Sequence, residues 1–117
     1  MSEIINKPWG YFQILDSQAG YQTKKLFVRA FSKLSLQSHK HRSEHWVVTK
    51  GKATVIIDEN KYDLDINESI YIPIESKHRL ENNTDNDLYI IEVQIGDSIK
   101  EDDIIRYDDI YGREILK

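Results

Sequence analysis

The stretch EHWVVTKGKATVIID, residues 44–58, is the most informative part of the chain for the fold. Two short runs rich in Val, Ile, Thr and Trp, which favour strands, flank the dipeptide Lys50-Gly51. Side chains alternate between the two faces of an extended chain, so Glu44, Trp46 and Val48 share one face. We expect the bulky Trp46 to turn this face inward. The stretch therefore predicts two strands joined by a tight hairpin turn.

The same pattern extends in both directions along the chain. Strand-like runs recur about every 8–12 residues between turn residues, which is typical of an antiparallel sandwich or barrel. The expected strands lie near residues 9–15, 24–31, 34–41, 44–50, 52–58, 61–65, 69–73, 78–82 and 88–95. The acids of 101–103, followed by Ile104-Ile105-Arg106, resemble the first turn of a helix. We therefore predict an all-β fold of about nine antiparallel strands with one short C-terminal helix.

Composition limits the class of protein. No linker or repeat divides the chain, so we expect one domain over residues 1–117. The 20 acidic and 16 basic residues give a net charge of -4, which argues against a nucleic-acid partner. No stretch is apolar enough for a membrane span or a secretory signal, so we expect a cytoplasmic protein. The absence of cysteine excludes disulfides and thiolate metal sites.

The four histidines are confined to two short segments, with His39, His41 and His45 in the first and His78 in the second. By strand alternation, Gln37, His39 and His41 share one face. Imidazole nitrogens combined with a carboxylate oxygen suit zinc, iron, manganese, nickel or cobalt better than calcium. The clustering therefore predicts a metal site with nitrogen and oxygen ligands.

Two motifs containing these histidines resemble those of a known family. The segment His39-x-His41-x-x-Glu44, followed by Gly51, is similar to the first cupin motif. The segment Pro73-x-x-x-x-His78-x-x-x-Asn82 is similar to the second. The resemblance implies a jelly-roll barrel whose metal is held by His39, His41, Glu44 and His78. In three places, Lys33, Asn67 and Glu75, the general cupin pattern often has glycine.

A closer resemblance is to one subgroup, the type II mannose-6-phosphate isomerase domain, which is commonly fused behind a mannose-1-phosphate guanylyltransferase. The likeness covers roughly residues 7–113. Its further stretches are Pro8-Trp9-Gly10, the segment 36–46, Tyr71-Ile72-Pro73 with the segment 78–82, and the segment 101–106. It implies interconversion of mannose 6-phosphate and fructose 6-phosphate with a divalent metal, zinc first among the candidates. The chain lacks a Gly-rich nucleotide-binding signature, so any guanylyltransferase would be a separate partner.

The position of the ligand glutamate is ambiguous by one residue. A forward count from His41 reaches His45, whereas a backward count from Gly51 reaches Glu44. Mannose-6-phosphate isomerases of the other sequence type carry a Gln-x-His pair and a later glutamate as ligands. That pattern resembles Gln37, His39 and Glu44, so we favour Glu44. His41 then becomes an extra ligand or a nearby base.

The resemblance also implies catalytic roles. Isomerisation moves a proton between adjacent carbons through an enediol, and His41 or His45 is the expected proton carrier. The substrate phosphate requires a cation, for which Arg42, Arg79 and Arg106 are the candidates because guanidinium binds phosphate bidentately. We favour Arg106 as a phosphate-binding and catalytic residue.

Two other functions remain open at the level of sequence. The domain is alternatively a non-catalytic sugar-binding or regulatory cupin, since fold alone does not decide function. It is alternatively an isomerase or epimerase of nucleotide-linked sugars, which use similar barrels. By analogy with other small jelly rolls we expect a homodimer.

Overall fold

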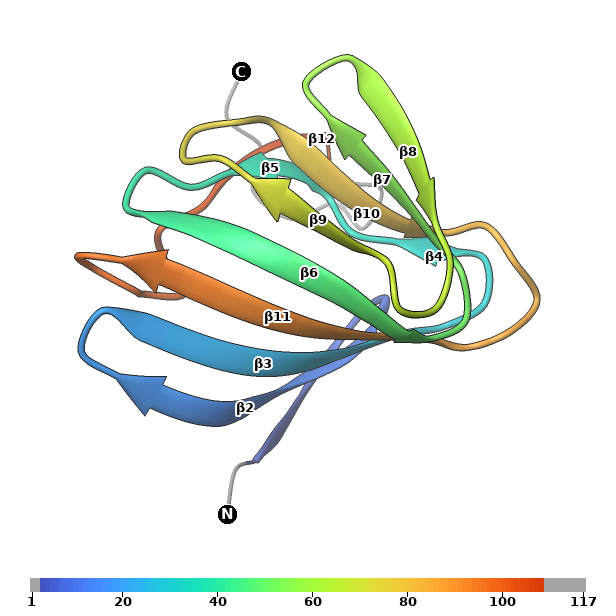
Figure 1. The fold of residues 1–117 in the computed structure, drawn as a ribbon, viewed down its shortest axis with the longest axis horizontal. Coiled ribbons are helices and arrows are strands. Elements are labelled where there is room, and N and C mark those ends of the chain that lie inside the picture. Colours follow the sequence, from blue (N-terminus) through green and yellow to red (C-terminus); the bar gives the residue numbers. More distant parts are fainter. Residues whose placement is uncertain (1–2, 109–117) are drawn as a thin grey trace.

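The computed structural model describes residues 3–108, which form two facing antiparallel β-sheets without a helix (Figure 1). The first sheet has the strand order β1 (Ile4–Lys7), β2 (Gly10–Gln18), β3 (Tyr21–Val28), β11 (Leu88–Gly96), β6 (Arg42–Lys50) and β9 (Ser69–Ile72). The second has β12 (Ile105–Asp108), β5 (Leu36–Ser38), β10 (His78–Asn82), β7 (Ala53–Ile57) and β8 (Asn60–Leu64), with β4 (Ser32–Lys33) paired to β10. The predicted all-β class is confirmed.

The predicted strands are present with shifted ends, except that the segment 34–41 contributes only the three residues of β5. The predicted hairpin turn at Lys50-Gly51 is wrong, because this dipeptide leads from β6 in one sheet to β7 in the other. Gly51 has a φ of +89°, and a Cβ there would lie 2.4 Å from the carbonyl oxygen of Asp87. Glycine is therefore required where the chain crosses between the sheets.

The predicted helix is absent from residues 101–108. Glu101 and Asp102 form a turn, and the next residues extend into β12, which pairs with β5. An isolated helix of two turns is marginal in water, whereas pairing with β5 satisfies the backbone groups of both strands. Within residues 3–108 there is accordingly no helix long and apolar enough to cross a membrane.

The inner face of the first sheet changes from apolar to polar along its strands. On β3 the inward residues run from Val28 and Leu26 to Lys24 and Gln22, and on β11 from Leu88 and Ile90 to Glu92 and Gln94. The apolar half packs against buried residues of the second sheet, including Ala53, Val55 and Leu80. The core thus fills one end of the sandwich and leaves a polar end, where both histidine segments lie.

Two of the three residues at cupin glycine positions adopt the conformation that glycine favours. The φ angles of Asn67 and Glu75 are +76° and +68°. A residue with a side chain loses about 1 kcal/mol in this left-handed region. The backbone N–H of Glu75 donates to the carbonyl of His39 at 2.9 Å, so this strained turn directly supports one of the histidines.

Candidate metal centre

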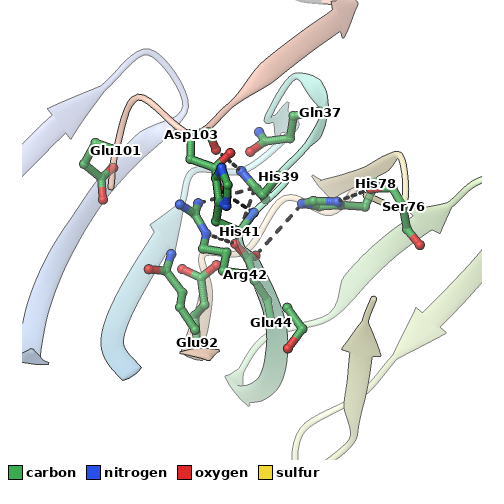
Figure 2. A network of polar contacts seen from close by, with 12 residues as sticks. Gln37, His39, His41, Arg42, Glu44, Ser76, His78, Glu92, Glu101 and Asp103 are labelled. Atoms are coloured by element: carbon green, nitrogen blue, oxygen red, sulfur yellow. Dashed lines mark hydrogen bonds and ion pairs between the residues drawn. The ribbon is translucent and has the colours of Figure 1, made fainter. Parts of the chain in front are cut away.

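Three buried side chains from both sheets meet at the polar end of the sandwich (Figure 2). His39 follows β5, Glu44 lies on β6 and His78 begins β10. The His39 Nε2 atom lies 3.4 Å from Glu44 Oε2, and His78 Nε2 lies 3.9 Å from Glu44 Oε1. One potential ligand atom from each residue lies within 4.8 Å of the other two. This spacing is suited to a single metal ion between them.

Hydrogen bonds fix both imidazoles in the form that binds metal. His39 Nδ1 lies 2.6 Å from the carbonyl oxygen of Asp103, and His78 Nδ1 lies 3.0 Å from that of Ser76. A carbonyl only accepts, so each Nδ1 carries the hydrogen and each Nε2 presents a lone pair. Both lone pairs face the Glu44 carboxylate, which is also an acceptor. A cation between them would attract all three, and buried His78 Nε2 has no hydrogen-bond partner among the described residues.

Burial keeps these imidazoles neutral. Burial, together with the positive charge of Arg42, lowers the pKa of His39 from an ordinary 6.5 to about 3. Burial also lowers the pKa of His78. Both rings are therefore deprotonated at Nε2 at neutral pH, as a metal ligand must be.

Arg42 and Trp46 hold the Glu44 carboxylate in place. Arg42 Nε donates to Glu44 Oε2 at 2.8 Å, and Trp46 Nε1 donates to Glu44 Oε1 at 3.0 Å. Arg42 Nη2 lies 3.4 Å from His39 Nε2, and its Nη1 donates to the carbonyl of Lys100 at 3.0 Å. Two neighbouring donors thus orient the carboxylate toward the histidines.

Two residues of the cluster, Glu44 and His78, line a cavity of about 120 Å³. Gln37, the cross-strand partner of His78, lines the cavity and donates its amide hydrogen to Ser35 Oγ at 3.1 Å. Of the three arginines proposed to bind phosphate, Arg42 and Arg106 line the cavity and Arg79 does not. Arg79 instead donates to the carbonyl of Leu34 and to the carboxylate of Asp108.

The structure does not bring His41 or His45 into the cavity. His41 is exposed, with Nδ1 3.8 Å from Asp97 Oδ1, and His45 stacks on Tyr71 with ring centroids 4.8 Å apart. Strand alternation fails for His41 because β5 ends at Ser38. The Asp103 carboxylate accepts hydrogen bonds from the backbone N–H groups of Lys40 and His41 at 3.0 and 2.9 Å, and these bonds fix a turn after the strand. Glu44, and not His45, is the residue beside His39 and His78.

Three cavity residues, Lys24, Glu92 and Gln94, are not among the metal, catalytic or phosphate residues predicted from the sequence. Alternation along β11 was the available signal, because Glu92 and Gln94 share a face with the apolar Leu88 and Ile90. Burial, together with the neighbouring Glu44, raises the pKa of Glu92 from an ordinary 4.5 to about 8. Glu92 also accepts a hydrogen bond from Trp46 Nε1 at 3.2 Å.

The raised pKa of Glu92 predicts that the metal-free protein loses stability as the pH rises toward 8. Between pH 4.5 and 8 the folded state holds a proton on Glu92 that the unfolded chain has released. The free energy of unfolding therefore falls with rising pH, by at most about 1.4 kcal/mol per pH unit. Below pH 6.5 the lowered pKa of His39 acts in the opposite direction, so the loss is clearest from pH 6.5 to 8.

Urea unfolding of the metal-free protein at several pH values in this window measures the slope. We expect Glu92→Gln to flatten it and Glu59→Gln, a change in the exposed β7–β8 turn, to leave it as in the parent chain. An unchanged slope in Glu92→Gln would show that this carboxyl does not titrate with folding.

Comparisons with known proteins identify the family of this chain. A family model described as Mannose-6-phosphate isomerase C-terminal matches residues 1–109. The alginate biosynthesis protein AlgA of Pseudomonas syringae pv. tomato is 49% identical over 109 residues, which are 93% of this chain and 23% of AlgA. The mannose-1-phosphate guanylyltransferase ManC of Salmonella typhimurium is 43% identical, over 97% of this chain and 24% of ManC. The chain thus spans about a quarter of the length of these curated relatives.

A solved structure shows the same architecture. An RmlC-like cupin from Shewanella frigidimarina superposes with a TM-score of 0.74 at 18% identity, covering 86% of this chain and 87% of that one. At this identity the likeness establishes the fold, which is that of a cupin. The match of the family model over nearly all of the sequence establishes the more specific relationship. The chain belongs to the family of mannose-6-phosphate isomerase C-terminal domains.

Proposed function

We propose that this domain is a divalent-metal-dependent isomerase that interconverts mannose 6-phosphate and fructose 6-phosphate. The observation that carries the proposal is the buried cluster of His39, Glu44 and His78 in a domain of this family, with Glu44 and His78 lining a cavity. The Nε2 atoms of His39 and His78 lie 3.4 and 3.9 Å from the Glu44 carboxylate, and three acceptors this close together favour a shared cation.

His39, Glu44 and His78 would hold the metal, with Gln37 as the fourth ligand. The Gln37 side chain is suited to this role because it lies across the strand pair from His78 and lines the cavity. Its nitrogen already donates to Ser35, so the amide oxygen is the atom to be offered. Nitrogen and oxygen ligands suit zinc, and also manganese, iron, nickel or cobalt. When bound, the metal would supply a Lewis acid that offsets the negative charge developing on the substrate oxygens as the proton leaves carbon.

Proton transfer is best assigned to Glu92. His41 and His45, the carriers expected from the sequence, lie outside the cavity, whereas Glu92 is a buried carboxyl within it. The ionised form of Glu92, which a cation held at Glu44 would favour, would accept the proton from C2 of the aldose and return it to C1. The hydroxyl proton would pass from O2 to O1, so that the ketose forms without net change in the side chain. Trp46, which donates to both Glu92 and Glu44, would hold the two carboxylates in their separate positions.

Metal analysis combined with an isomerase assay tests the proposal. We expect about one bound divalent ion per chain, loss of turnover on chelation, and recovery when zinc or another first-row ion is returned. A metal-free protein with full activity would contradict the role of the metal. A metal-loaded protein inactive on mannose 6-phosphate would favour the sugar-binding module, or the nucleotide-sugar enzyme if it converts a nucleotide-linked hexose instead.

A further inference from the structure

We propose that Lys24 and Gln94 bind the phosphate group of the substrate, and that the Glu101 carboxylate occupies this position until the substrate displaces it. This inference rests on the proposed isomerase function and adds a phosphate subsite to it. The sequence suggested three arginines for the phosphate and none of these residues. Lys24, Gln94 and Glu101 each line the same cavity as Glu44 and His78 of the metal cluster.

Lys24 is a buried cation held at the cavity wall. It lies on the inner face of β3 and is only 4% exposed. Its ammonium lies 4.1 Å from the centroid of the Phe12 ring and forms an ion pair with Glu101. A buried ammonium is unfavourable without a partner anion, and the cation–π contact positions it without neutralising its charge. Lys24 therefore requires an anion in the cavity.

Gln94 supplies a donor that the described residues do not satisfy. Its side chain is 1% exposed, and its Oε1 atom accepts a hydrogen bond from Gln22 Nε2 at 3.2 Å. Its own Nε2 atom is buried and has no hydrogen-bond partner within residues 3–108. A buried amide N–H without an acceptor costs roughly 1–3 kcal/mol. An acceptor oxygen brought by a ligand would remove this penalty.

The two donors lie close to each other in the sheet. In the β3–β11 ladder Gln94 pairs with Gln22, and Lys24 pairs with Glu92. Lys24 and Gln94 are thus diagonal neighbours on adjacent strands and point to the same inner face, within reach of one tetrahedral anion. A phosphate monoester offers both the negative charge that Lys24 needs and an acceptor for Gln94.

Glu101 has the properties of an anion that a ligand replaces. Its side chain is 54% exposed, in contrast to the buried Lys24, and it belongs to the segment between β11 and β12 (Figure 2). Once released it would be solvated by water, whereas the ammonium would stay in the cavity. A phosphate dianion carries more charge and more acceptor oxygens than a carboxylate, so it is the stronger partner for Lys24.

The same segment also contacts the metal centre. Its Lys100 carbonyl accepts from Arg42, and its Asp103 carbonyl accepts from His39. These contacts place Glu101 two or fewer residues from the groups that orient the metal cluster. A phosphate bound at Lys24 would therefore hold the sugar carbons toward His39, Glu44 and His78.

The test is calorimetric titration of the metal-loaded full chain with inorganic phosphate at low ionic strength. We expect Lys24→Met to weaken phosphate binding roughly tenfold, because a charge-assisted hydrogen bond is lost. We expect Glu101→Gln to tighten it by about threefold, because a competing anion is removed. The matched controls are Lys25→Met, whose ammonium lies on the outer face over Tyr89, and the neighbouring Asp102→Asn. Neither control should change the affinity.

The opposite effects of Lys24→Met and Glu101→Gln on phosphate affinity distinguish a phosphate site from a structural ion pair. If Lys24–Glu101 only held the segment in place, both substitutions would have the same direction or no effect on phosphate, and the proposal would be overturned. Phosphate bound only to the metal would be equally insensitive to Lys24→Met and would also overturn it. If Lys24→Met fails to fold, Glu101→Gln decides by its sign, and Gln94→Leu should weaken binding as a second check.

The titration requires no turnover, so the two proposals fail separately. Lys24-dependent phosphate binding in a protein that does not isomerise mannose 6-phosphate would refute the enzyme and retain the subsite. An active isomerase whose KM for mannose 6-phosphate is unchanged in Lys24→Met would retain the enzyme and refute the subsite.

Discussion

His39→Ala and His78→Ala should each abolish both metal binding and isomerase turnover while the protein stays folded. Each change removes one of the three buried ligands, and the other two, even with Gln37, cannot hold the ion against a chelator. The fold should persist because the apolar core, with Leu26, Val55 and Leu80, occupies the other end of the sandwich. Metal content per chain, turnover and far-UV circular dichroism measured on the same preparations test the prediction.

Two other histidines provide matched controls. His41 and His45 are both exposed and lie outside the cavity, so His41→Ala and His45→Ala should retain metal and activity. Full metal content in His39→Ala or His78→Ala would refute the ligand assignment. Loss of turnover with metal retained in His45→Ala would restore the proton-carrier role that the sequence suggested for it.

Glu44→Ala should destabilise the metal-free protein by about 3–5 kcal/mol, since it leaves a buried guanidinium without its anion. Arg42 is only 6% exposed and donates to Glu44 at 2.8 Å, and the Trp46 N–H would lose one of its two acceptors. Glu44→Gln keeps an acceptor oxygen near Arg42 and Trp46, so its loss of stability should be smaller than that of Glu44→Ala. Urea unfolding of the chelated proteins at pH 7 gives these differences.

The paired substitution tests the cause. In Arg42→Met/Glu44→Leu both charges are removed, and buried ion pairs replaced by apolar residues are often close to neutral in stability. We expect the double variant to be more stable than Glu44→Ala, with Glu59→Ala in the exposed turn as a control near the parent value. A Glu44→Ala protein within about 1 kcal/mol of the parent would mean that Arg42 finds another partner or water.

The elements predicted well from sequence are those with strict alternation over a buried face. The run from Glu44 to Lys50 indicated its inward side correctly, as Glu44, Trp46 and Val48 are all buried. The edge strand β1 was missed because its side chains are mostly exposed, so burial imposes no pattern on them. The strand β12 was mistaken for a helix because its acidic approach resembles a helical first turn.

The candidate site was predictable only in part, because much of it depends on long-range pairing. Two motifs contained His39, Glu44 and His78, but alternation wrongly placed His41 on their side, since a turn capped by Asp103 interrupts the strand. The Lys24–Glu101 ion pair joins residues 77 positions apart. Nothing in the local sequence indicates such a contact before the strand register is known.

The separation of an apolar end from a polar end in the first sheet has an evolutionary consequence. Substitutions at the polar end can change the ligand or the reaction without altering the apolar residues that supply most of the folding free energy. The RmlC-like neighbour, with 18% identity and a TM-score of 0.74, keeps the frame although most of its side chains differ. Because stability and ligand binding depend on different ends of the sandwich, the domain is a suitable starting point for laboratory redesign of substrate preference.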